Sequence, residues 1–203
     1  MKNEKRSSKV NVRDTAFIAV FGALWGLSEI LFGGVLHSFQ VPFTGLVMAS
    51  VSILIAVTGS SFIQRKGSII TMGLIASFMK IFSIGGIILT PVLAIIIEAV
   101  ILEIIILIGR RTLLSICIAG GVTVTYTILH RVIGGIYFYS LDVIQILDKM
   151  ITSASKNLNL DLTLAWIIML TIILIHFLAG TAAGALSWWL ARKIKLRLNY
   201  EIQ

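Results

Sequence analysis

Long apolar runs, separated by short charged or turn-like breaks, make up most of the chain. A helix that crosses a bilayer needs about 20 largely apolar residues, and most of the runs have roughly that length. They lack the alternation of transmembrane β-strands and are too long for them. The pattern therefore predicts an all-α membrane protein with six spanning helices, at approximately 15–36, 43–63, 68–83, 87–109, 112–138 and 162–191.

Basic residues gather in segments that a six-helix topology places on one side. The tail at 1–14 holds five Lys or Arg residues and the tail at 192–203 holds four, while the breaks after the second and fourth apolar runs hold two each. Lys and Arg are retained in the cytoplasm during insertion. We therefore expect a six-helix domain over 15–191 in the cell membrane, with both termini cytoplasmic.

Composition agrees with this class. Hydrophobic residues make up 58% of the chain and charged residues only 13%, against about a quarter charged in soluble domains. The net charge of +8 is accounted for by the basic tails and breaks, so it does not indicate a nucleic-acid partner. A single cysteine, Cys117, excludes an internal disulfide framework. The first apolar run is longer than the core of a signal peptide, so we expect a spanning helix there.

The connection at 140–161 mixes apolar residues with Asp142, Asp148 and Lys149. One interpretation is an interfacial helix that lies across the outer face of the membrane. The other is a solvated loop. The sequence favours neither, and it shows no convincing internal repeat.

Several ionisable side chains fall inside the predicted spans, where a charge costs at least about 2.5–3.5 kcal/mol. Two of them, His130 and Arg131, stand together in the apolar stretch TILHRVIGG. Helical spacing places most of the polar groups on stripes of small residues, which are the faces where membrane helices pack closely. We therefore expect the following groups to point into the bundle: Glu29 beside Gly26 and Gly33, Lys80 beside Gly73 and Ala76, His130 beside Gly134, and His176 beside Gly180, Ala183 and Ser187.

Seven of these and neighbouring polar groups fall at one level in the outer half of the predicted bundle. They predict a solute-binding pocket open to the outside, formed by Glu29, His37, Lys80, Tyr126, His130, Arg131 and Tyr137. Structural alternatives stay open: Lys80 could extend to the interface, and Glu29 could form an ion pair with Lys80 or Arg131. His130 and Arg131 point about 100° apart. His176 alone is more typical of a hydrogen-bonded core histidine.

Signatures of enzymes are missing from the sequence. There is no phosphate-binding Gly-rich loop, no His-Glu-x-x-His and no Gly-x-Ser-x-Gly elbow. Glu98 and Glu103 are five residues apart and do not share a helix face. No His or Cys spacing is typical of a metal site. We therefore expect neither catalysis nor a resident cofactor or metal.

The stretch AVFGALWG places Ala19 and Ala23 four residues apart, with Gly22 and Gly26 beside them. In this motif and in its predicted architecture the chain resembles the substrate-binding S components of energy-coupling factor transporters. The resemblance implies that Ala19, Gly22, Ala23 and Gly26 dock onto a transmembrane coupling subunit. It also implies two cytoplasmic ATPase partners and uptake of a vitamin, a cofactor precursor or a metal ion.

An organic solute fits this sequence better than a metal ion, because the segment 1–14 lacks the early histidine of the cobalt and nickel members. A small heteroaromatic or zwitterionic vitamin would suit charges of both signs and rings such as Trp25, Tyr126 and Tyr137. The alternatives are a metal-specific S component, a membrane scaffold or assembly factor without a solute, and a small membrane hydrolase using Glu98 or His176.

Overall fold

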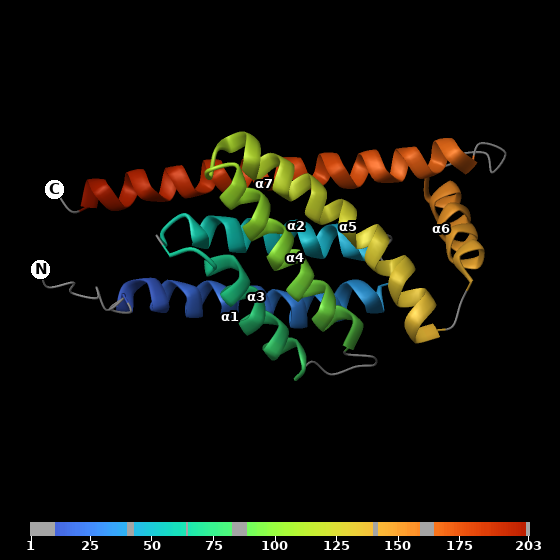
Figure 1. Ribbon diagram of the computed structural model, residues 1–203, viewed down its shortest axis with the longest axis horizontal. Helices are drawn as coiled ribbons and strands as arrows, with labels where there is room; N and C mark the ends of the chain where they lie inside the picture. Colours follow the sequence, from blue (N-terminus) through green and yellow to red (C-terminus); the bar gives the residue numbers. More distant parts are fainter. Residues whose placement is uncertain are drawn as a thin grey trace, which may run out of the picture.

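The computed structural model describes residues 11–39, 43–63, 65–82, 89–139, 142–158 and 165–201, and over these ranges the chain is helical without strands. The all-α prediction is confirmed. The helices, drawn in Figure 1, are α1 (Val12–Ser38), α2 (Thr44–Ser60), α3 (Ser68–Lys80), α4 (Leu89–Ile108), α5 (Leu113–Tyr139), α6 (Val143–Leu158) and α7 (Ala165–Glu201).

Four of the helices, α1, α4, α5 and α7, are long and apolar enough to cross a membrane. Helices α2 and α3 are apolar but have 17 and 13 residues. At about 1.5 Å per residue they measure about 26 and 20 Å, which is shorter than the roughly 30 Å hydrocarbon core. The chain is thus a multi-pass helical membrane protein by its four candidate spans. Six crossings stay a prediction that depends on α2 and α3.

Helices α5 and α7 approach each other until their backbones touch. A Cβ atom built on Gly120 would collide with the carbonyl group of Gly180, and one built on Gly184 would collide with that of Ile116. Small residues permit such close packing in lipid. The predicted packed stripe of α7 is confirmed, because Gly180, Ala183 and Ser187 are all buried.

Tryptophan and aliphatic side chains from the first four helices fill the centre of the bundle. Trp25 of α1 is fully buried, together with Ile53 of α2, Met72 of α3 and Leu102 of α4. A Cβ atom on Gly73 would collide with the Ala99 side chain, so this glycine lets α3 lie close to α4 beside the Trp25 ring. This packing fixes α1 against α3 and thereby sets the place of the polar groups described below.

The start of α1 and the end of α7 lie at the same end of the bundle (Figure 1, left). Side-chain contacts agree with the picture. The Phe62 ring stacks on Phe17 of α1 at 5.6 Å between centroids, and the Lys195 ammonium lies 5.6 Å from the centre of the Phe62 ring. The turns with Arg65, Lys66, Arg110 and Arg111 belong to this end as well, which we call the basic end.

The described basic segments share one end of the bundle, which a six-helix topology requires but which does not by itself test the number of crossings. Lys2, Lys5, Arg6 and Lys9 lie outside the described residues. Which side of the membrane the basic end faces stays a prediction, with the cytoplasm favoured by the retention of Lys and Arg.

At the basic end, two charged side chains cap helices that lie far from them in the sequence. The Glu103 carboxylate of α4 accepts hydrogen bonds from the backbone N–H groups of Gly67 (2.8 Å) and Ile69 (2.7 Å) at the start of α3. Arg111 donates from one guanidinium nitrogen to the carbonyl oxygens of Ser60 (2.8 Å), the last residue of α2, and of Ile63 (3.1 Å) just after it. Helix ends leave such groups unsatisfied, and an acid at the N-terminus and a cation at the C-terminus suit the helix dipole. Both side chains are therefore structural.

The connection predicted at 140–161 contains a helix, α6, so the solvated-loop interpretation is wrong for 143–158. In Figure 1, α6 lies crosswise to the long helices at the end opposite the termini. Ile146 is buried against α5, where Gly135 leaves space for its side chain. A position in the outer membrane interface stays a prediction.

The topology can be measured with single cysteines in a Cys117→Ala background. We expect Met150→Cys to react with a membrane-impermeant maleimide in intact cells. Lys66→Cys and Tyr200→Cys should react only after permeabilisation, because the basic end is expected to face the cytoplasm. Labelling of position 66 in sealed cells would overturn this orientation.

Candidate functional site

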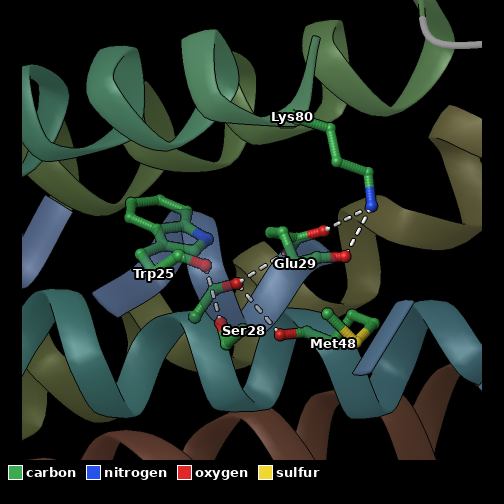
Figure 2. A network of polar contacts seen from close by, with 6 residues as sticks. Trp25, Ser28, Glu29, Met48 and Lys80 are labelled. Atoms are coloured by element: carbon green, nitrogen blue, oxygen red, sulfur yellow. Dashed lines mark hydrogen bonds and ion pairs between the residues drawn. The ribbon is translucent and has the colours of Figure 1, made fainter. Parts of the chain in front are cut away.

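The candidate site contains an ion pair between Glu29 of α1 and Lys80 of α3 (Figure 2). The Lys80 ammonium is 3.7 Å from the Glu29 carboxylate and donates a 2.6 Å hydrogen bond to the Glu29 backbone carbonyl oxygen. Glu29 is 7% exposed. Of the two ion-pair partners that the sequence allowed for Glu29, the structure selects Lys80.

Helix α2 supports the carboxylate from the other side. The Ser52 hydroxyl lies 3.3 Å from a Glu29 carboxylate oxygen and 3.0 Å from the Met48 carbonyl oxygen. A hydroxyl has one hydrogen to donate, so Ser52 shares it between these two acceptors. The Trp25 indole nitrogen faces the same carboxylate (Figure 2), but it has no hydrogen bond of ordinary geometry within the described part of the chain.

Glycines on α1 let Lys80 come this close. A Cβ atom on Gly33 would lie 2.9 Å from the Lys80 ammonium nitrogen. Nearer the middle of α1, Gly22 packs against Ile75 and Gly26 against Met79 and Ala76 of α3. The small-residue stripe of α1 is therefore used, at its glycines, for packing inside this chain.

A second buried acid, Glu98 of α4, lies near this pair. Glu98 is 6% exposed and forms no hydrogen bond or ion pair with the residues the structure describes. It is close enough to Glu29 and to Tyr126 for electrostatic interaction with both. One ammonium group, that of Lys80, thus stands against two carboxyl groups. The Glu98 carboxyl group can therefore either keep its proton or bind a ligand with a positive or hydrogen-donating group.

Glu98 is a candidate site residue that the sequence prediction left out. The sequence feature that could have identified Glu98 is its position in the most apolar of the candidate spans. The spacing of Ile95, Glu98 and Leu102 also places it on the buried face of α4. A lone acid on such a face is expensive unless it has a use.

The predicted site residues of α5 do not all lie on the same side of the helix. The Tyr126 hydroxyl lies 3.2 Å from Nδ1 of His130, and His130 also interacts with the backbone of Thr90 at the start of α4. Arg131 is exposed, because it is turned about 100° from His130. Tyr137 is 79% exposed, since it lies near the end of α5, where the described neighbours leave its side uncovered.

The structure therefore brings Glu29 and Lys80 together, with Glu98 and Tyr126 nearby. It does not bring Arg131 or Tyr137 into the same interior. His37 belongs to α1, but its side chain lies outside the described residues. Trp25, proposed as a stacking surface, is fully buried in the core instead.

His176 of α7 behaves as a core histidine, as its sequence context indicated. It is buried, its Nδ1 atom lies 2.8 Å from the Ile172 carbonyl oxygen, and its ring meets Phe43 edge-on at 5.8 Å. Within the ranges described, no three His, Cys, Asp or Glu side chains are grouped so that they could hold a metal ion.

The four residues predicted to dock a partner also fall into two sets. Gly22 and Gly26 are buried against α3, whereas Ala19 is exposed and Ala23 is partly exposed. Of these four residues, only the two alanines are accessible at the surface.

Together these features define a class: a multi-pass helical membrane protein with a buried, acid-rich polar site between its first five helices. Comparison with protein-family models, with curated proteins and with solved structures found no match to this chain.

Proposed function

We propose that the chain is the solute-binding subunit of an uptake transporter of the S-component type. In this proposal it takes a small vitamin or cofactor precursor from outside the cell. It then delivers the solute by associating with a coupling subunit and two cytoplasmic ATPases. The observation that carries the proposal is Glu98, an acid buried near the Glu29–Lys80 pair that has no hydrogen-bond or ion-pair partner among the described residues.

The site chemistry suggests what the solute carries. A positively charged or N–H donor group would satisfy Glu98, and Tyr126 with His130 offers hydrogen-bonding groups and rings at the side of α5. Lys80 is already engaged by Glu29, so it is a weaker candidate for an anionic group. A small heteroaromatic or zwitterionic molecule with a basic nitrogen fits this set.

Ala19 and Ala23 would supply the docking surface for the coupling subunit. Their small side chains are the part of the α1 stripe that α3 leaves uncovered, and small residues allow a partner helix to approach closely.

The test is mass spectrometry of small molecules released from the purified protein, followed by binding measurements with the molecule found. We expect Glu98→Gln to weaken binding by roughly 10- to 150-fold, which corresponds to the loss of one charged hydrogen bond of about 1.5–3 kcal/mol. Asp148→Asn on the exposed side of α6 makes the same chemical change and should keep full affinity. Arg131→Ala should also keep it, because Arg131 points outward.

A membrane scaffold without a solute is the second candidate. It is favoured by the way Glu29, Lys80 and Ser52 satisfy one another between three helices. If no small molecule is enriched, or if the molecule found binds equally to the wild type and to Glu98→Gln, the scaffold is the better account.

A further inference from the structure

A hollow at the basic end is the strongest unassigned feature of the molecule. It has a volume of ≈ 160 Å³ and lies among the ends of α2, α4 and α7 and the start of α5. Its cations are Arg111, Arg192 and Lys195, and Trp188 and Ala191 form part of its wall. A larger open groove of ≈ 550 Å³ along α7 shares Trp188, Arg192 and Lys195 with it. We call the two together the basic hollow.

The cations of the basic hollow are held in place by their neighbours. The Arg192 guanidinium lies 4.1 Å from the centre of the Trp188 ring, and the Lys193 ammonium lies 4.6 Å from that of Trp189. Arg111 is fixed by its hydrogen bonds to the end of α2. Among the described residues no acid lines either part of the hollow. Several positioned cations without a counter-charge suit an anion.

The smaller part of the hollow admits a compact anion. Its volume of ≈ 160 Å³ is many times the roughly 10–15 Å³ of probe volume that one water molecule requires, so a phosphate group has room to enter. Arginine binds phosphate oxygens through two N–H groups at once.

The depth of the hollow indicates where such a phosphate comes from. The 22 residues from Trp166 to Ser187 extend about 33 Å along α7, close to the thickness of the hydrocarbon core. For a crossing that begins at Trp166, we infer that Trp188 and the residues after it lie at the membrane–water interface. Trp189 and Leu196, which line the open groove, are 52% and 71% exposed, and the neighbouring Leu190 is 36% exposed. These side chains give acyl chains an apolar surface next to the cations.

We propose that the basic hollow binds the headgroup of an anionic phospholipid. The lipid phosphate lies between Arg192 and Lys195, and its acyl chains follow the exposed apolar side of α7. Basic pockets between helices on the cytoplasmic side recognise headgroups in this way. The site is separate from Glu98 and does not depend on the transport proposal.

The test uses the full chain in an uncharged detergent, titrated with short-chain phosphatidylglycerol and followed by thermal unfolding. Phosphatidylcholine and inorganic phosphate are titrated in parallel at equal ionic strength. We expect phosphatidylglycerol alone to stabilise strongly. The double variant Arg192→Gln/Lys195→Gln should bind it roughly 30-fold more weakly, since each cation near an anionic lipid contributes a factor of about five. The charge-matched control Arg13→Gln/Arg197→Gln lies at the same end outside the hollow and should bind normally.

A second variant, Ala191→Leu, narrows the hollow without changing charge and should also weaken binding. The proposal is overturned if the control pair weakens binding as much as the test pair, because general surface charge would then explain it. It is also overturned if phosphatidylcholine binds as tightly as phosphatidylglycerol, if inorganic phosphate stabilises equally, or if Ala191→Leu binds like the wild type.

Discussion

Glu103→Ala is expected to lower the free energy of unfolding by about 3–6 kcal/mol. Glu103 is 2% exposed and accepts the backbone hydrogen bonds that open α3, from Gly67 and Ile69. Hydrogen bonds to a charged group contribute about 1.5–3 kcal/mol each, and α3 lacks a side-chain cap of its own at Gly67. The loss is a large share of the 5–15 kcal/mol that stabilises a typical protein.

Denaturant-induced unfolding from mild detergent measures this loss. Glu103→Gln, which keeps an acceptor oxygen but not the charge, should fall between the wild type and Glu103→Ala. Asp148→Ala removes an exposed acid from α6 and should stay within about 0.5 kcal/mol of the wild type. If Glu103→Ala unfolds like the Asp148 variant, the carboxylate does not hold the start of α3.

The helices that the sequence predicted best are those with long apolar runs. The runs at 15–36 and 112–138 match α1 and α5 to within three residues at each end, because apolarity and helix coincide there. Helix α7 continues ten residues beyond the predicted end at 191. The predicted helix ended before Arg192 and Lys193 because both residues are charged. In the structure both stack on tryptophan rings and remain part of the helix. Apolarity marks the part of a helix that crosses the hydrocarbon, not where the helix ends.

The sequence allowed us to predict which charged residues point inward, but not which groups they contact. Spacing placed Glu29 and Lys80 on packed faces, and the structure confirms that both are turned inward. Local pattern gave no sign that Glu103 would cap a helix whose start lies 36 residues earlier, at Gly67. Arg131 and Tyr137 share a helix with His130, but the sequence does not show which parts of α5 the other helices cover. These relations depend on how helices pack, which the spacing along one helix does not contain.

Lys80→Met is expected to lower the free energy of unfolding by about 3–5 kcal/mol, the usual effect of removing one partner from a buried ion pair. The change leaves the Glu29 carboxylate with Ser52 but without its counter-charge. Glu29→Gln should cost less, because the Lys80 ammonium keeps its 2.6 Å hydrogen bond to the Glu29 backbone carbonyl. The double variant should be more stable than the sum of the two losses predicts, by about 0.5–3 kcal/mol.

Two neighbouring glycines on α1 supply a matched control for this pair. Alanine favours a helix over glycine by about 1 kcal/mol. Gly34→Ala should therefore stabilise the protein, because its added methyl group meets no atom of the described residues within 4 Å. Gly33→Ala gains the same preference but pushes against the Lys80 ammonium, so it should be less stable than Gly34→Ala. In a Lys80→Met background that difference should shrink. If the two losses at Glu29 and Lys80 simply add, and both alanine variants behave alike, the pair is not coupled and does not hold α1 to α3.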